Sequence, residues 1–213
     1  MARWTVEPVS RDSPAESAPI PDRAWPGSSG APPLGDWLEA RLLDRRVIWV
    51  RGTLDDLVAT SAATKLMALD GSGDDPIQLH LNCGDGALSA ALTLMDTIST
   101  LGVPLEAVCA GRAEGPPLGV LAVAHRRLAA SHSRLRLGAG EVAAHGSAAD
   151  LTRELEQHQR QLERFIELVA QATRQPAERV EIDLGSGRYF EPEEAIEYRL
   201  IDGVWNGRTS ASR

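Results

Sequence analysis

The residue types that most often do chemistry are few in this chain and form no recognisable set. Its two cysteines, Cys83 and Cys109, make neither a disulfide framework nor a metal-binding spacing. The five histidines show no ligand spacing, and no cysteine or carboxylate frames His125 and His132 as a site. We therefore expect no metal site and no cofactor.

The composition is that of a soluble globular protein. The 213 residues carry a net charge of −8, which argues against nucleic acid as a partner, and the length suits one domain with a sizeable core. The longest apolar run, residues 118–124, is too short to cross a bilayer, and the N-terminus has no apolar stretch of secretory type. We expect no membrane partner and a cytoplasmic protein.

The predicted elements follow the order of a parallel α/β fold. Residues 1–33 are rich in proline and serine and are predicted to form a disordered arm ahead of a domain over residues 34–213. Strands and helices are predicted to alternate after it, with turns at residues 83–86 and at Gly111. The predicted strands cover residues 45–52, 77–82, 105–110 and 134–137. The predicted helices cover residues 37–43, 54–70, 87–101, 116–128, 148–173 and 192–198.

Four segments, in order along the chain, carry a family resemblance. RRVIWVRGTLDD is similar to a first strand and the turn after it, and IQLHLNCGDG to a strand with an Asn-Ser-Pro-Gly-Gly turn. VCAGRA resembles the strand before a serine nucleophile, and residues 194–202 resemble a C-terminal Glu-Ala-x-Glu-Tyr-Gly-Leu-x-Asp signature. Together, over about residues 36–205, they resemble ClpP, the proteolytic subunit of the Clp protease. The resemblance implies an α/β fold of ClpP/crotonase type, a ββα superhelix with a protruding handle helix.

The resemblance places the family's catalytic triad at three glycines. Counting from Asn82, the nucleophile falls at Gly115. Counting from residues 132–134, the histidine falls at Gly138, and the aspartate falls at Gly187. A glycine cannot attack a carbonyl, accept a proton or orient an imidazole. The implied protein is a catalytically inactive ClpP-like subunit.

The oxyanion hole that the resemblance implies is altered as well. The family uses backbone N–H groups of its Gly-Gly turn and of the residue after the nucleophile, and these positions are Asp85, Gly86 and Pro116 here. Proline has no N–H to donate, and losing one such donor typically lowers the rate by about a hundredfold or more. Asp85 adds negative charge near the place where an oxyanion would form.

Residual serine-type peptidase activity, as an ATP-dependent Clp protease subunit, is one alternative. A triad displaced from the expected positions would draw on Ser89, on His125 or His132, and on Asp96 or Asp150. None of these residues lies where such a nucleophile is expected, directly after a turn that leads into a helix and with a base at a suitable spacing along the chain.

Two other residues, Cys83 and Glu114, are candidate catalytic groups and keep an enzymatic function among the alternatives. Cys83 could act as the nucleophile, but the sequence offers no base or cation to activate it, and we expect Asp85 to raise the pKa of its thiol. Glu114 could be the acidic base of a crotonase-type enzyme acting on an acyl-CoA, although no basic cluster for CoA is evident.

Partners are implied by the resemblance alone. It implies heptameric rings made with copies of this chain or with catalytically active ClpP paralogues. Gln78 and His80 stand where the family presents aromatic residues to its ATPase, and the proline-rich arm replaces the gating segment, so docking of a Clp ATPase is doubtful. The predicted helix over residues 148–173 carries an apolar stripe that suits either a ring-to-ring contact or an ordinary core: Leu151, Leu155, Leu162, Ile166 and Val169.

Overall fold

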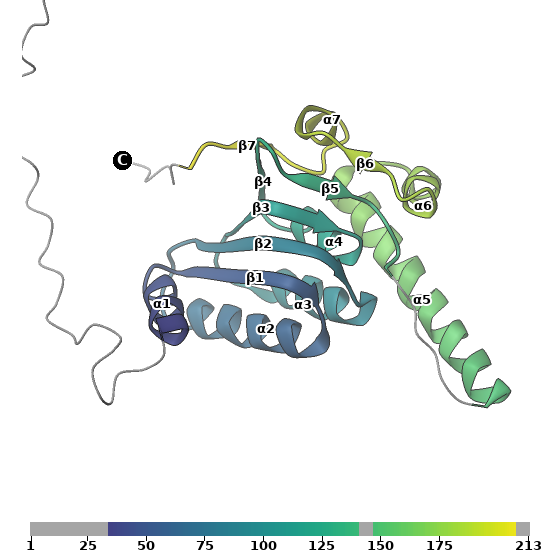
Figure 1. Ribbon diagram of the computed structural model, residues 1–213, viewed down its shortest axis with the longest axis horizontal. Coiled ribbons are helices and arrows are strands. Elements are labelled where there is room, and N and C mark those ends of the chain that lie inside the picture. The colour runs from purple at the N-terminus through teal and green to yellow at the C-terminus, as the bar shows by residue number, and fades with distance from the viewer. Residues whose placement is uncertain (1–33, 141–146, 208–213) are drawn as a thin grey trace, which may run out of the picture. The chain divides into compact units, whose positions relative to one another are not determined.

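The computed structural model describes residues 34–140 and 147–207 (Figure 1). The arm expected over residues 1–33 lies outside the described residues. Contacts divide the chain into Met1–Leu38 and Glu39–Arg213, and the fold below is that of the second unit. Helix α1 (Leu34–Leu43) contains this boundary.

A sheet that is parallel except at one edge organises the second unit. Five of its strands follow one another in space, all parallel: β1 (Val47–Leu54), β2 (Ile77–Gly86), β3 (Leu105–Glu114), β4 (Arg126–Ala130) and β7 (Gly203–Trp205). A branch leaves this path at β3, whose last residues pair in parallel with β5 (Arg134–Arg136). Strand β5 pairs in turn, antiparallel, with β6 (Tyr189–Phe190). The carboxyl end of β3 therefore meets the branch, and the candidate site lies there.

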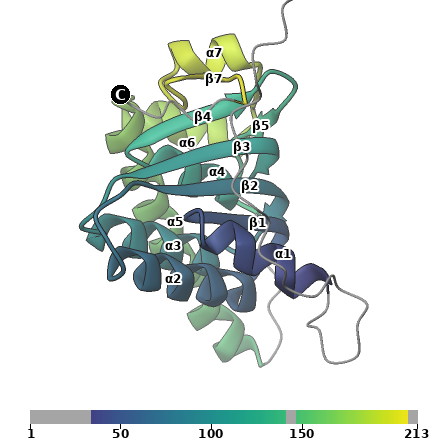
Figure 2. The same ribbon diagram turned by 90° about the vertical axis from the view of Figure 1, so that its left-hand side faces the viewer.

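Helices cover one face of this sheet, as Figure 2 shows for α2 (Asp56–Asp70), α3 (Leu88–Thr100) and α4 (Pro116–Ala122). Buried side chains recur at helical spacing in α3, where Ala91, Leu94, Met95 and Ile98 face the core. All seven residues of α4 are buried, because this short helix packs against β2, β3 and α3. The mixed α/β fold confirms the predicted fold class.

Helix α5 (Ala148–Thr173) begins and ends at the predicted residues and projects from the sheet layers (Figure 1). Its second half packs on the core through Phe165 and Val169, which are fully buried. Its first half does not: Leu155 leaves 57% of its surface exposed. The apolar stripe therefore serves the core at one end and is uncovered at the other. Helices α6 (Ala177–Gly185) and α7 (Pro192–Glu197) follow it.

The predicted helix over residues 116–128 is wrong in its second half. Helix α4 ends at Ala122, and β4 starts four residues later. Alanine and leucine favour a helix here, but pairing between β4 and β3 overrides that preference. Glu106 and Arg126 lie opposite each other in this pairing and form an ion pair of 2.8 Å.

The turns predicted after two strands are also wrong. Residues 83–86 belong to β2, and Gly111 lies inside β3, because both strands continue past an irregularity in their pairing. The short elements α6, β6 and β7 were not predicted. Strands of two or three residues carry too little alternation to be recognised from sequence.

Candidate functional site

The three glycines of the predicted triad lie together around Arg136. A Cβ added to Gly138 would stand 3.8 Å from the Cα of Gly115 and 3.0 Å from Nη1 of Arg136. A Cβ added to Gly187 would stand 3.7 Å from the same Nη1. The fold thus brings together three positions that are far apart in the sequence, and it places one guanidinium beside two of them.

Main-chain hydrogen bonds explain why these positions meet. Gly115, which directly follows β3, donates its N–H to the carbonyl of Arg136 at 2.9 Å. One residue further along, Leu137 donates to the carbonyl of Arg188, also at 2.9 Å. Gly115 has φ +70°, a conformation that side-chain-bearing residues rarely adopt, and it is the residue before α4.

The predicted oxyanion positions surround Gly115. An Oδ1 atom of Asp85 would lie 3.3 Å from a Cβ on Gly115, and this buried atom has no hydrogen-bond partner among the described residues. Pro116 is the first residue of α4 and is buried. A Cβ on Gly140 would stand 2.8 Å from the carbonyl oxygen of Gly86 and 3.0 Å from Pro116 Cγ, so these segments are in close contact.

Strand register places a charged cluster on the same face. Across β3 and β5, Arg112 lies opposite Arg134 and Glu114 lies opposite Arg136, which in turn lies opposite Tyr189 of β6. Residues two apart in a strand share a face, so all five side chains lie on one side. We call this set the arginine face.

Glu114 is the buried centre of the arginine face. Its Oε1 lies 3.3 Å from Nη2 of Arg134, and its Oε2 lies 3.6 Å from Nε of Arg136. Both guanidiniums also stand over the ring of Tyr189, at 5.6 and 5.9 Å from its centroid. This cluster was not predicted from the sequence, because its residues come together only through the pairing of β3, β5 and β6. The one hint in the sequence was that Arg134 and Arg136 are two residues apart in a predicted strand and so share a face.

Cys83 lies in β2 beside this site, and its thiol is buried. Burial raises the pKa of the Cys83 thiol to about 11, against a smaller lowering by a backbone hydrogen bond and by Arg112. The expected direction of the pKa shift is right, but burial rather than Asp85 causes it. The thiol is therefore protonated near neutral pH.

The residues of a displaced triad do not assemble. Ser89 donates its hydroxyl hydrogen bond to Asp56, and Nδ1 of His125 accepts from the backbone of Leu105. His125 and Asp96 line one cavity of about 440 Å³, but Ser89 does not line it. His132, exposed between β4 and β5, and Asp150, in the first turn of α5, lie on other elements.

Gln78 and His80 belong to a polar chain on the sheet. The Gln78 amide donates to Glu106 at 2.7 Å, and its oxygen lies 3.3 Å from Nε2 of His80. His80 stacks on Trp49 with ring centroids 5.1 Å apart and meets Trp205 edge-on. Burial lowers the pKa of His80, and Glu106 acts in the opposite direction.

Two comparisons place the chain among known proteins. The family model described as Clp protease matches residues 36–208. The ATP-dependent Clp protease proteolytic subunit of Deinococcus radiodurans is 28% identical over 168 residues, which cover 78% of this chain and 82% of that protein. The chain belongs to the Clp protease family, which confirms the resemblance found in the sequence.

The described residues contain no group of three or more histidine, cysteine, aspartate or glutamate side chains placed to hold a metal ion. Within the same part of the chain, no helix is both long and apolar enough to span a membrane.

Proposed function

We propose that this chain is a catalytically inactive ClpP-like subunit that acts through assembly rather than through hydrolysis. The observation that carries the proposal is the meeting of Gly115, Gly138 and Gly187 around Arg136. Peptide hydrolysis by this family needs a hydroxyl, an imidazole and a carboxylate within hydrogen-bond reach of one another. Here the guanidinium of Arg136 lies beside the two positions proposed to match the imidazole and the carboxylate.

The surroundings of Gly115 support the same proposal. Pro116, the next residue, has no N–H with which to stabilise an oxyanion. Oδ1 of Asp85, which has no hydrogen-bond partner within the described residues, lies beside Gly115, where negative charge would develop. A negative group at that place disfavours the tetrahedral intermediate of acyl transfer.

Glu114 and Cys83 do not support an enzyme. The buried Glu114 carboxylate forms ion pairs with two guanidiniums of this chain, so both of its oxygens face side chains of the protein rather than an acyl-CoA substrate. The Cys83 thiol stays protonated near neutral pH because burial raises its pKa to about 11.

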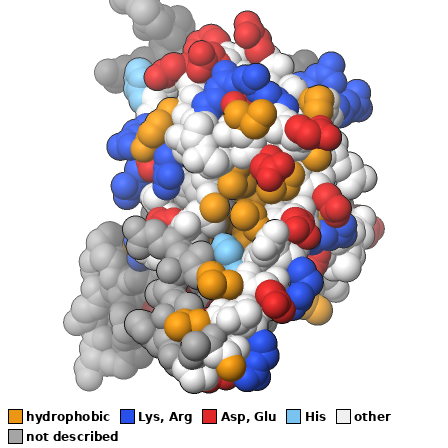
Figure 3. Space-filling model, turned by 90° about the vertical axis from the view of Figure 1, so that its right-hand side faces the viewer, with side chains coloured by type: hydrophobic (Ala, Val, Ile, Leu, Met, Phe, Trp, Pro, Cys, Tyr) orange, Lys and Arg blue, Asp and Glu red, His pale blue; other side chains and the backbone are white. Residues whose placement is uncertain are grey.

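The surface available for assembly includes the projecting half of α5. The face toward which α5 projects carries hydrophobic side chains between acidic and basic ones (Figure 3). Leu155 lies on this half of the helix with more than half of its surface exposed. We propose heptameric rings made with copies of this chain or with catalytically active paralogues, in the cytoplasm. Docking of a Clp ATPase stays doubtful, since Gln78 and His80 form a hydrogen-bonded polar pair.

Labelling tests the loss of chemistry. A fluorophosphonate should give no covalent adduct, measured by intact mass, under conditions in which an active Clp proteolytic subunit is labelled to completion. Stoichiometric modification of one serine in this chain would contradict the proposal.

Native mass measurement tests assembly. The chain should form rings alone or when co-expressed with an active paralogue, and Leu155→Asp should weaken them. Met67→Asp is the matched control, because Met67 is similarly exposed but lies on α2. A strictly monomeric protein in both settings rules the assembly role out.

A further inference from the structure

The arginine face has more cationic groups than it has acceptors. Arg134 and Arg136 form ion pairs with one carboxylate, that of Glu114, and Arg112 lies on the same face, opposite Arg134. A guanidinium offers five N–H donors in a planar fork that suits carboxylates. None of these three side chains donates a hydrogen bond to any residue in the described part of the chain. The face therefore retains a net positive charge and unused donors.

These donors are accessible and held in place. Arg134 and Tyr189 leave more than half of their side-chain surfaces exposed, and Arg136 leaves 26% exposed. Gly187 has no side chain, and apart from its chain neighbours the described residues place only Arg136 Nη1 within 4 Å of the position a Cβ would take. Glu114, buried beneath, holds both guanidiniums over the Tyr189 ring.

An acceptor completes the site on the far side of Gly115. Oδ1 of Asp85 is buried there without a hydrogen-bond partner among the described residues. A ligand matched to this arrangement brings a carboxylate to the arginines and an N–H donor to Asp85. A peptide has both groups. A fully ionised phosphate monoester has no donor and would be repelled by Asp85, and the net charge of −8 opposes a nucleic acid.

We propose that the arginine face binds the carboxylate of a peptide, with Asp85 accepting a backbone N–H from the same peptide. This inference rests on the proposed function, because binding takes the place of hydrolysis at the same site. Arg136 is the cation beside Gly138 and Gly187, and Arg134 and Arg112 lie opposite each other on the same face.

Fluorescence anisotropy with the full chain tests the binding. The probe is a fluorescein-labelled hexapeptide with glutamate side chains and a free C-terminus. The matched peptide has glutamine side chains and a C-terminal amide, and it should bind at least about tenfold more weakly, since hydrogen bonds to charged groups are lost. Equal affinity of the two peptides overturns the inference.

Variants locate the binding. Arg136→Gln should weaken the acidic peptide about tenfold. Because Arg136 also neutralises buried Glu114, Arg112→Gln provides a second test at an exposed side chain, which forms no ion pair with another described residue, and should weaken binding severalfold. Arg51→Gln, an exposed arginine on β1, is the control and should leave binding unchanged. A loss in Arg51→Gln as large as in Arg112→Gln overturns the assignment.

The mass of the peptide after incubation separates the two proposals. An intact peptide, together with tighter binding of the acidic peptide than of the amide peptide, supports both the inactive subunit and carboxylate recognition. Cleaved peptide contradicts the inactive subunit but leaves carboxylate recognition in place. Intact peptide without measurable binding contradicts carboxylate recognition alone.

Discussion

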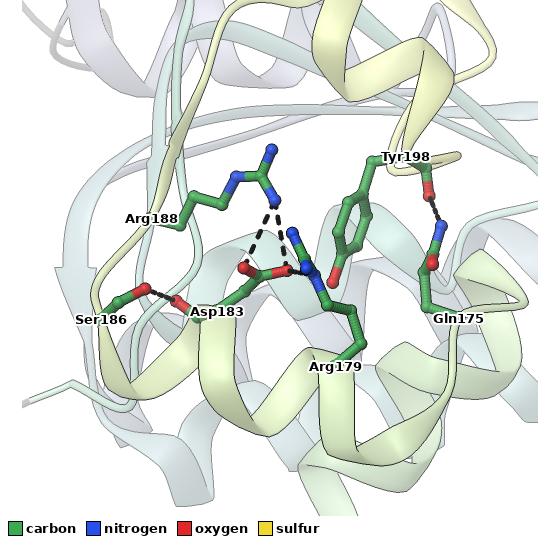
Figure 4. A network of polar contacts seen from close by, with 6 residues as sticks. All are labelled: Gln175, Arg179, Asp183, Ser186, Arg188 and Tyr198. Carbon is green, nitrogen blue, oxygen red and sulfur yellow. Dashed lines mark hydrogen bonds and ion pairs between the residues drawn. The ribbon is translucent and has the colours of Figure 1, made fainter.

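Two buried carboxylates in this protein have the same types of neighbouring residue but differ in how well those neighbours are hydrogen-bonded to them. Asp183 in α6 and Glu114 in β3 each expose 7% of their side chains. Each lies between two arginines, and each has a tyrosine nearby. Figure 4 shows the Asp183 cluster, with Arg179 and Arg188 directed at the carboxylate.

The Asp183 cluster is well paired. Nε of Arg179 donates to Oδ2 at 2.8 Å, and Nη1 of Arg188 donates to the two oxygens at 3.3 and 3.4 Å. Burial, followed by interactions with Asp183, raises the pKa of Tyr198, whose ring lies edge-on to Phe190. The cluster links α6 to β6 and to the end of α7.

The Glu114 cluster is poorly paired by comparison. Its ion pairs are 3.3 and 3.6 Å long and are not hydrogen bonds. Oε1 of Glu114 and Nε of Arg136 are buried and have no hydrogen-bond partner in the described part of the chain. Around Asp183, Arg179 lies one turn earlier on the same helix, and Arg188 lies just after that helix ends, so both can adjust to the carboxylate. Partners on neighbouring strands are placed by register. We infer that the Asp183 cluster stabilises the fold, whereas the arginines around Glu114 still have N–H groups with which to bind a ligand.

Asp183→Asn should have the largest effect on stability. Removing one partner of a buried, hydrogen-bonded ion pair should lower the free energy of unfolding by about 3 kcal/mol. Urea unfolding measures it, with Glu178→Gln, an exposed position in the first turn of α6, as a control that should change little. A loss below about 1 kcal/mol would show that Asp183 is not the better-paired carboxylate.

Gly115→Ala should come next. The positive φ of Gly115 disfavours a Cβ, which would also approach Asp85, so we expect a loss of about 2 kcal/mol. Gly185→Ala is the matched control, because no described atom lies within 4 Å of its Cβ position and its φ is not positive. That control should be neutral or slightly stabilising. Equal losses in the two variants would mean that the backbone at Gly115 is not the cause.

Glu114→Gln should lower stability by only about 1 kcal/mol, because its two arginines form longer ion pairs with it, at 3.3 and 3.6 Å, and no hydrogen bond to it within the described residues. Urea unfolding under the same conditions as for Asp183→Asn makes the comparison direct. Losses of the same size would remove the distinction drawn between the two clusters.

The smallest effect is a pH dependence at a third buried polar group, His80, whose Nδ1 is also buried without a partner among the described residues. Burial lowers its pKa below the ordinary 6.5. As pH falls from 6.5 through the lowered pKa, the unfolded chain binds a proton at His80 that the folded chain does not, so stability decreases. Urea midpoints between pH 8 and pH 5 should fall less steeply in His80→Gln. Identical slopes would show that His80 is not responsible.

Long amphipathic and strongly apolar segments were predictable from sequence, and pairing-dependent segments were not. Helix α5 was predicted at its true bounds because its apolar period runs uninterrupted over 26 residues. The first three residues of strand β4 were predicted as the end of a helix, since the composition of RRLAA suits a helix and only β3 and β7 make it a strand. At the site, the nearness of Gly115, Gly138 and Gly187 was predictable through the family resemblance.

The sequence by itself determined the family, the order of the main elements and the glycines that stand where the resemblance places a triad. These depend on residue types at set spacings, which a linear chain records directly. Only the tertiary structure decided that Arg136 lies beside two of those glycines, that Oδ1 of Asp85 has no hydrogen-bond partner among the described residues, and that two arginines share one buried carboxylate. Strand register and burial bring those groups together, and neither is a property of any single segment.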